Sequence, residues 1–209
     1  MKVALGLKAH SGWAVLVVLG FSGQNFQVVD RRRIELVEEG EAAWARQPYH
    51  AAEHRAEADA RNLVRRGTKA AHRVALQEMK ATVKRLGAQS HQITACGVLL
   101  PAPMPDWTTG EILAVHFRMH KAEGVLFPDA LARAAERCSL NLVGIPEKTL
   151  SQEAPKLMGK SLNELTKLVA ALGKIVGPPW GKDQKSAALA AMVALQAGIT
   201  DRGSKLALI

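Results

Sequence analysis

The chain has 209 residues, with 28 Lys and Arg against 19 Asp and Glu, which gives a formal net charge of +9. This balance excludes an acidic, disordered solvating chain, and an apolar fraction of 48% is enough for a sizeable core. The longest apolar stretch, residues 13–21, is far shorter than the roughly 20 residues that span a bilayer, so we expect no membrane contact. Lys8 and His10 interrupt the N-terminal region and no cleavage site follows, so we expect a cytoplasmic protein. Two distant cysteines, Cys96 and Cys138, predict buried thiols rather than a disulfide framework.

The first part of the chain predicts three antiparallel strands. Val- and Leu-rich segments at 2–7 and 12–19 flank a turn at 8–11. The segment 25–36 then alternates apolar and polar side chains, as in a half-exposed strand. We therefore expect the chain to open as a β-meander.

The middle of the chain predicts a long helical region and a fourth strand. Residues 48–85 are Ala-rich and charged, which indicates one long helix or two in series, with Gly67 as the interruption. The apolar run 92–100 predicts a strand. It ends at a proline-rich segment, because proline cannot donate a hydrogen bond to a sheet ladder.

Helical signals follow this strand. Thr108 and Glu111 have the spacing of a capping box. An apolar stripe at helical spacing continues from it: Ile112, Val115 and Met119. Pro128 predicts a kink or a restart in this helical region, and a short strand is expected at 140–145.

Two helices are expected to close the chain. Ser161 and Glu164 form a second capping box, and the helix that they start should stop at residues 177–179, which read Gly-Pro-Pro. The last helix is predicted from near Asp183 to about residue 197.

The element order is β-β-β-α-β-α-β-α-α, which is the order of the ribonuclease H-like fold. We therefore predict an α/β protein with a mixed five-stranded sheet flanked by helices. The first three strands are antiparallel, and strands four and five run parallel to strand one. A single domain is expected over 1–209, with a long helical segment at about 48–86 between the third and fourth strands.

Four segments resemble the RuvC-type Holliday junction resolvases. Residues 3–16 read VALGLKAHSGWAVL and resemble that family's first hairpin. Residues 119–126 resemble the helix before its fifth strand, 140–150 that strand and the next turn, and 178–190 the closing helix. The resemblance covers most of the chain outside 48–85. It implies DNA recombination or repair as the setting, with a homodimer acting on four-way junctions.

The departures from the family pattern concern its catalytic carboxylates. The family uses four carboxylates to hold two divalent metals that cleave a phosphodiester. Here Lys8 stands in place of the first-strand Asp, Leu99 in place of the fourth-strand Glu, and the closing pair is Asp183 and Ser186. An ammonium repels Mg²⁺, which needs oxygen ligands in octahedral geometry. The resemblance therefore implies a resolvase-like pseudoenzyme that holds no metal and no cofactor.

Lys8 and Asp183 have two interpretations. In the first, the ammonium replaces the metal and pairs with the surviving carboxylate. In the second, Asp183 is the N-cap of the last helix, because Asp is among the best capping residues, and Lys8 is an ordinary solvated residue.

Basic residues occur in sets that could neutralise phosphates. Residues 31–33 are consecutive arginines, and Arg61, Arg65 and Lys69 recur at four-residue steps along one predicted helix face. The aromatic fraction of 4% argues against base stacking and favours weakly sequence-specific backbone contacts. The alternative is a solvated surface. Nucleic-acid contacts are assigned to Lys8, His10, Ser11, Arg31, Arg32, Arg33, Arg65, Arg66, Lys69, Lys121 and Lys182.

One short pattern points to zinc. His50, Glu53 and His54 match H-x-x-E-H, in which two histidines share one helix face. The pattern needs a third ligand from elsewhere, and the interpretation that we favour is a polar helix surface. His116 and His120 lie one helical turn apart and are expected to be surface or hydrogen-bonded core histidines.

Three functions remain open from the sequence. The first is an inactive RuvC-like protein that binds duplex or branched DNA through a basic face. The second is a protein-interaction or scaffold module with the same fold. The third is a Mg²⁺-dependent, structure-specific endonuclease with displaced carboxylates drawn from Asp30, Glu38, Glu39 and Glu41.

Overall fold

The computed structural model describes residues 1–22, 25–38, 40 and 42–200. Its strands are β1 (Lys2–His10), β2 (Trp13–Ser22), β3 (Asn25–Glu35), β4 (Gln92–Leu100) and β5 (Leu142–Pro146). Its helices are α1 (Ala42–Ala45), α2 (Pro48–Ala52), α3 (Glu57–Ala88), α4 (Thr109–Leu113), α5 (His116–Arg137), α6 (Leu150–Met158), α7 (Leu162–Val176) and α8 (Lys182–Thr200), with a 3₁₀ turn η1 (Glu147–Thr149).

The strands form one mixed sheet in the order β3-β2-β1-β4-β5. The pairs β1–β2 and β2–β3 are antiparallel, whereas β1–β4 and β4–β5 are parallel. The predicted sheet is confirmed in the number of its strands and in their directions. In the β1–β4 ladder Leu7 pairs with Val98, so the next residues, Lys8 and Leu99, are neighbours at the carboxyl ends of the two strands.

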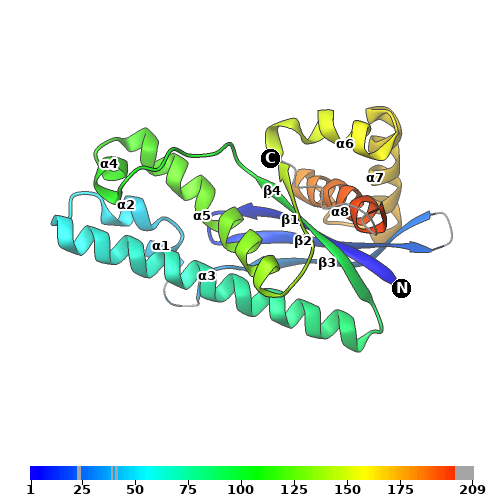
Figure 1. Ribbon diagram of the computed structural model, residues 1–209, viewed down its shortest axis with the longest axis horizontal. Coiled ribbons are helices and arrows are strands. Elements are labelled where there is room, and N and C mark those ends of the chain that lie inside the picture. The colour runs from blue at the N-terminus through cyan, green and yellow to red at the C-terminus, as the bar shows by residue number, and fades with distance from the viewer. Residues whose placement is uncertain (23–24, 39, 41, 201–209) are drawn as a thin grey trace.

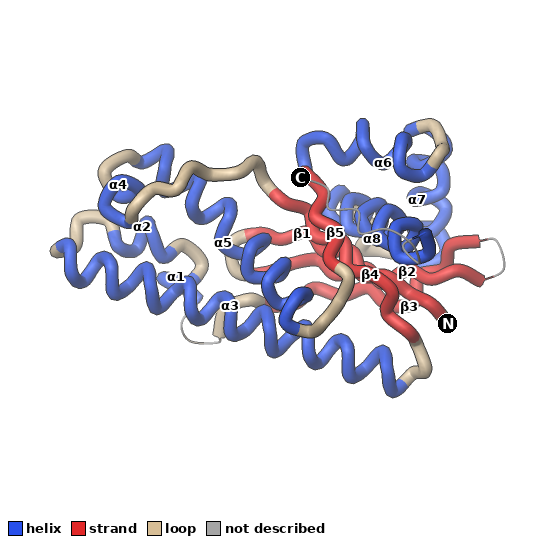
Figure 2. The backbone as a smooth tube through the Cα atoms, viewed as in Figure 1, coloured by secondary structure: helices blue, strands red, loops and turns tan. Residues whose placement is uncertain are grey.

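Helices cover both faces of the sheet (Figures 1 and 2). Helices α3 and α5 lie on one face, and α6, α7 and α8 lie on the other. The short helices α2 and α4 pack against one end of α3 and α5, where these two helices extend past the strands. No helix in the described part of the chain is long and apolar enough to cross a membrane.

Alternation along β1 separates the core from the candidate site. Leu5 and Leu7 are buried against the layer formed by α3 and α5. The intervening residues, Gly6, Lys8 and His10, face α8, because successive side chains of a strand point to opposite faces. Only glycine fits at position 6, because α8 packs directly on the strand there: a Cβ atom would be 1.9 Å from the carbonyl oxygen of Ala187. The polar side chains that follow Lys2 in β1 are Lys8 and His10, and both lie on the α8 side near the carboxyl end of the strand.

The first hairpin differs from the prediction. A turn was expected at 8–11, but β1 continues to His10 and pairs it with Trp13. The connection is the two residues Ser11 and Gly12, and Gly12 adopts a φ of 84°, in the left-handed region that glycine enters without a steric penalty. Lys8 and His10 are thus strand residues, which places their side chains at fixed positions on one face of the sheet.

The helical region 48–86 is also divided differently. The chain breaks at residues 53–56, between α2 and α3, and not at Gly67. Gly67 is buried inside α3, where an added Cβ atom would be 2.6 Å from Cβ of Pro48. This glycine lets α2 pack closely on α3 rather than ending a helix. The restart predicted at Pro128 is wrong as well, since α5 continues through it.

The two predicted capping boxes are confirmed. Thr108 accepts a hydrogen bond from the backbone N–H of Glu111, and Ser161 does the same for Glu164. The returning hydrogen bonds from Thr108 lower the pKa of Glu111. The helix after the first box is shorter than its apolar stripe predicted: α4 ends at Leu113, and α5 begins three residues later. The fifth strand, Leu142–Pro146, begins two residues later and ends one residue later than predicted.

Candidate functional site

Lys8 forms an ion pair at the carboxyl end of β1. Its Nζ lies 2.5 Å from Oε2 of Glu147, the first residue of η1 after β5. The Lys8 side chain is only 14% exposed, so the ammonium is largely removed from water. Because an unpaired buried charge is costly, the carboxylate of Glu147 stabilises the ammonium in this position. Glu147 was not assigned a role from the sequence, although its place directly after a parallel strand puts it at this edge of the sheet.

Asp183 lies beside His10 rather than beside Lys8. Its Oδ2 is 3.1 Å from Nε2 of His10, whose ring stacks on Trp13 with ring centroids 4.2 Å apart. The predicted ion pair between Lys8 and Asp183 is therefore wrong in its partner. The N-cap interpretation is wrong too, because α8 begins at Lys182 and Asp183 lies inside its first turn. A carboxylate there is favoured by the positive end of the helix dipole.

Leu99 and Ser186 complete the positions that the family resemblance marks. Leu99 is 1% exposed and packs in the apolar cluster under α8, next to Lys8 in the sheet. Ser186 lies one helical turn after Asp183 on α8. Lys8 and Leu99 thus lie at the carboxyl ends of β1 and β4, and Asp183 and Ser186 lie in the first turns of α8.

The side chains at this end do not fit a pair of divalent metals. Such metals need several oxygen ligands, and Leu99 offers none. The carboxylate of Glu147 is held by the ammonium of Lys8, and that of Asp183 faces His10. The ammonium of Lys8 lies at the carboxyl end of β1, and its charge opposes a cation placed beside it. We derive no metal-dependent step at this site.

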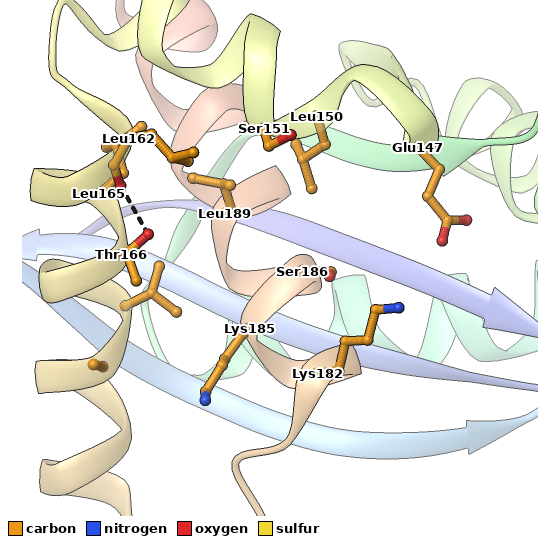
Figure 3. A pocket seen from close by; sticks show the side chains of 12 residues that line it. Glu147, Leu150, Ser151, Leu162, Leu165, Thr166, Lys182, Lys185, Ser186 and Leu189 are labelled. Atoms are coloured by element: carbon orange, nitrogen blue, oxygen red, sulfur yellow. Dashed lines mark hydrogen bonds between the residues drawn. The ribbon is translucent and has the colours of Figure 1, made fainter.

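A pocket of about 500 Å³ opens next to these residues, between η1, α6, α7 and α8. Figure 3 shows Glu147 and Lys182 pointing into the same space beside Ser186, with Lys185 one turn further along α8. Most of the remaining lining is apolar: Leu150, Leu162, Leu165, Val169, Ala170 and Leu189. The polar rim is therefore the part that adjoins the carboxyl end of β1.

The three consecutive arginines of β3 have structural partners. Arg31 donates hydrogen bonds to the carbonyl oxygens of Gly177 and Pro179, both at 2.8 Å, and so holds the loop before α8. Arg32 pairs with Asp30. Arg33 pairs with Glu35 and lies 4.1 Å from the ring centroid of Trp13. Arg31 therefore has a structural role. The run of three arginines in the sequence did not indicate this role.

The remaining predicted contact residues do not join one face. Arg65, Arg66 and Lys69 lie on α3, across the sheet from α8. Arg65 donates a hydrogen bond to Asn62, and the guanidinium of Arg66 lies 5.2 Å from the ring centroid of Trp44. Lys121 is half-buried on α5. By contrast Lys8, His10 and Lys182 meet at the α8 side of the sheet, and exposed Ser11 lies in the adjoining turn.

The carboxylates considered for an alternative metal site form ion pairs with arginines where the structure describes them. Asp30 lies 2.7 Å from Arg85 and 3.0 Å from Arg32. Glu38 pairs with Arg73, and a hydrogen bond from that guanidinium lowers the pKa of Glu38. Two further candidates lie outside the described residues: Glu39 and Glu41.

The H-x-x-E-H segment does not form a two-histidine helix face. Helix α2 ends at Ala52, and His54 has a φ of 63° in the turn that follows. The side chain of His54 is 90% exposed, whereas His50 turns toward α5. The predicted pairing of His50 with His54 is therefore not formed.

The strand order, the strand directions and the two helical layers define the chain as an α/β protein with the ribonuclease H-like fold. Among solved structures it resembles RuvC of Thermus thermophilus in complex with a Holliday junction substrate, at 9% identity and a TM-score of 0.48, over 96% of this chain and 97% of that one. A second Thermus thermophilus RuvC structure matches at 11% identity and a TM-score of 0.48, over 94% and 95% of the two chains. Neither a family model nor a curated protein sequence matches the chain.

Proposed function

We propose that the protein binds nucleic acid through the phosphate backbone at the carboxyl end of β1, without cleaving it by a two-metal mechanism. The observation that carries the proposal is the ion pair between Lys8 and Glu147, 2.5 Å long, beside the apolar Leu99. It puts a cation where the family resemblance calls for a metal-binding carboxylate. The function is then binding, in a setting of DNA recombination or repair, rather than catalysis.

The cations around this pair supply the attraction for phosphate. Lys148 on η1 and Lys182 and Lys185 on α8 are exposed, and no ion pair engages them within the described chain. Lys182 and Lys185 are one helical turn apart on α8, and Figure 3 shows Lys182 pointing toward Glu147 and Lys185 pointing away from it. With Lys8, four lysines oppose the two carboxylates Glu147 and Asp183, which leaves a local formal charge of 4 − 2 = +2 with His10 neutral.

The start of α8 reinforces this attraction. Its first backbone N–H groups have no partner within the helix, and its dipole favours an anion at that end. The ring of Trp13 is covered by His10 and by the guanidinium of Arg33, so it offers little face for base stacking. Contacts to phosphates, with weak sequence preference, are therefore the mode of binding that these residues favour.

Two double variants test where the nucleic acid binds. Lys182→Ala with Lys185→Ala removes the exposed lysines of α8, and Lys80→Ala with Lys84→Ala is the matched control, which removes two exposed lysines of α3 on the opposite face. Fluorescence anisotropy with labelled duplex and four-way junction DNA, over a series of salt concentrations, measures the number of phosphate contacts. Each phosphate contact contributes about 0.9 to the slope of log K against log salt. The magnitude of this slope should therefore fall by about 2 in the α8 variant and stay almost unchanged in the control.

Two results would count against the proposal. Equal losses in both double variants would place binding elsewhere on the surface. No binding at low salt by the wild-type chain would favour the second function, an interaction module for another protein. The homodimer that the resemblance implies belongs to the proposal, and sedimentation equilibrium with and without junction DNA measures it.

A further inference from the structure

Three histidines far apart in the sequence meet at one end of the helical layer. His50 comes from α2, and His116 and His120 come from the first two turns of α5, which α2 contacts (Figure 1). One ring nitrogen from each residue lies within 4.8 Å of the other two. Nε2 of His116 and Nε2 of His120 are 3.1 Å apart. We propose that these three imidazoles bind one zinc-type transition-metal ion.

The spacing suits such an ion. Zinc binds imidazole nitrogen at about 2.0–2.1 Å, so tetrahedral nitrogen ligands lie about 3.3 Å from one another. His116 and His120 are separated by four residues, which puts both on one face of α5. The ring centroids of His50 and His120 are 4.6 Å apart and their planes are tilted by 57°, so the rings face a common space instead of stacking. Small side-chain rotations bring all three nitrogens to one ion.

A buried carboxylate orients the first of these rings. The side chain of Glu123 is 3% exposed, and its Oε1 accepts hydrogen bonds from the backbone N–H groups of Tyr49 and His50, at 3.1 and 3.0 Å. Its Oε2 lies 2.7 Å from Nδ1 of His50. The carboxylate therefore keeps the proton on Nδ1 and leaves the lone pair of Nε2 for a metal. Carboxylates commonly hold metal-binding histidines in this way.

The burial of Glu123 points independently to a cation. A carboxylate that is almost removed from water needs compensating positive charge as well as hydrogen bonds. Within the described residues no lysine or arginine is paired with Glu123, and its ion-pair partner is the imidazole of His50. A divalent ion on Nε2 of His50 would place that positive charge one imidazole away.

The second ring has a similar arrangement. Oε1 of Glu53 lies 3.9 Å from Nδ1 of His116, on the side of the ring away from His120. Nε2 of His116 is then the nitrogen that faces the shared space. The side chain of His116 is 62% exposed, so an ion can enter from solvent and a water molecule can occupy the fourth position.

The donor set defines the class of metal. Three imidazoles with no carboxylate among them favour Zn²⁺, Co²⁺, Ni²⁺ or Cu²⁺ over Mg²⁺ and Ca²⁺, which prefer oxygen. An ion at this place would link α2 to α5. It would lie on elements other than β1, η1 and α8, so the inference stands independently of the proposed nucleic-acid contact.

Zinc titration of the full, untagged chain tests the site, after removal of bound metal with a chelator. The expected result is one Zn²⁺ per chain, with a rise in melting temperature, and a visible Co²⁺ spectrum typical of tetrahedral coordination. His116→Ala and His120→Ala should remove binding at equimolar zinc. His54→Ala is the matched control, because His54 belongs to the H-x-x-E-H pattern but is 90% exposed outside the cluster. It should bind zinc like the wild type.

Glu123→Gln tests the positioning role separately. The amide still accepts the backbone hydrogen bonds, but its NH₂ group donates to Nδ1 of His50 and so moves the ring proton to Nε2. Zinc affinity should fall by about 10- to 100-fold, whereas the melting temperature of the metal-free protein stays close to that of the wild type. If this variant does not fold, the two histidine variants decide. The proposal is overturned by wild-type affinity in His116→Ala and His120→Ala, by loss of binding in His54→Ala, or by the absence of stoichiometric binding to the wild type.

Discussion

Substituting Gly6 by alanine should separate α8 from the sheet. A Cβ atom at Gly6 would lie 1.9 Å from the carbonyl oxygen of Ala187 and 2.6 Å from the backbone nitrogen of Ala191. Both neighbours are helix backbone and cannot rotate away, so the whole helix must retreat by about 1.5 Å to reach ordinary van der Waals contact. That movement also withdraws Asp183 from His10 at the candidate site.

The cost follows from the core that α8 supplies. Residues 187, 188 and 190–195 of this helix are all buried at 2% exposure or less. Overpacking a well-packed core costs about 1–3 kcal/mol, and a clash between two backbones belongs at the upper end. We therefore expect Gly6→Ala to lower the free energy of unfolding by about 3 kcal/mol, measured from urea denaturation followed by circular dichroism.

Gly124→Ala is the matched control for this change. Gly124 is exposed on α5, and nothing lies within 4 Å of an added Cβ atom. Alanine is favoured over glycine inside a helix by about 0.5–1 kcal/mol, so this variant should be slightly more stable than the wild type. A Gly6→Ala chain within about 1 kcal/mol of the wild type would refute the close contact between α8 and β1, since the two overlaps leave no room for a methyl group.

Three further predictions concern partners elsewhere in the fold. Arg31→Ala should lower the free energy of unfolding by about 1.5–3 kcal/mol, because it removes charged hydrogen bonds to the loop before α8. The midpoint of urea denaturation should fall accordingly, and an unchanged midpoint would contradict this role of Arg31. Burial raises the pKa of Cys96 to about 12. A thiol reagent at pH 8 should therefore label Cys138 first and Cys96 only after unfolding. Rapid labelling of both cysteines would argue against the burial of Cys96. The imidazole of His72 lies 3.3 Å from Oδ2 of Asp129, and this contact lowers the pKa of Asp129 in the folded protein. The stability that it contributes is therefore present above the pKa of the unfolded chain and is lost as the pH falls through the lower pKa of the folded protein. Acid denaturation of Asp129→Asn should lack that component, and an identical acid transition would count against it.

Local signals in the sequence predicted most of the fold. The bounds of β4 agree with the predicted run 92–100, because a proline follows directly and ends the ladder. Both capping boxes depend on two residues three positions apart, which is a contact within one helical turn. These features need no information from distant parts of the chain.

The candidate sites were predicted less completely because their contacts are distant in sequence. The polar residues Lys8 and His10 indicated a turn, yet they are strand residues whose side chains serve the site on one face of the sheet. The partner of Lys8 is Glu147, which only the pairing of β4 with β5 brings to that edge. Functional sites are where local pattern and final structure most often disagree.

The histidine cluster has the same explanation. His50 meets His116 and His120 because α2 folds back onto the start of α5, and the local pattern paired it with His54 instead. Gly67, taken as a helix interruption, is the residue that allows the close packing of α2 on α3. The sequence pattern paired two histidines within five residues, whereas in the structure His50 of α2 contacts histidines of α5.

The central claim is that the ion pair between Lys8 and Glu147 marks a surface that holds nucleic acid and does not cut it. The most direct test incubates the wild-type chain with end-labelled four-way junction DNA and Mg²⁺ or Mn²⁺ at low salt. The same sample is then run on a native gel and on a denaturing gel. We predict a complete shift on the native gel and intact strands on the denaturing gel. Cut strands that a chelator abolishes, or no shift at all, would contradict the account.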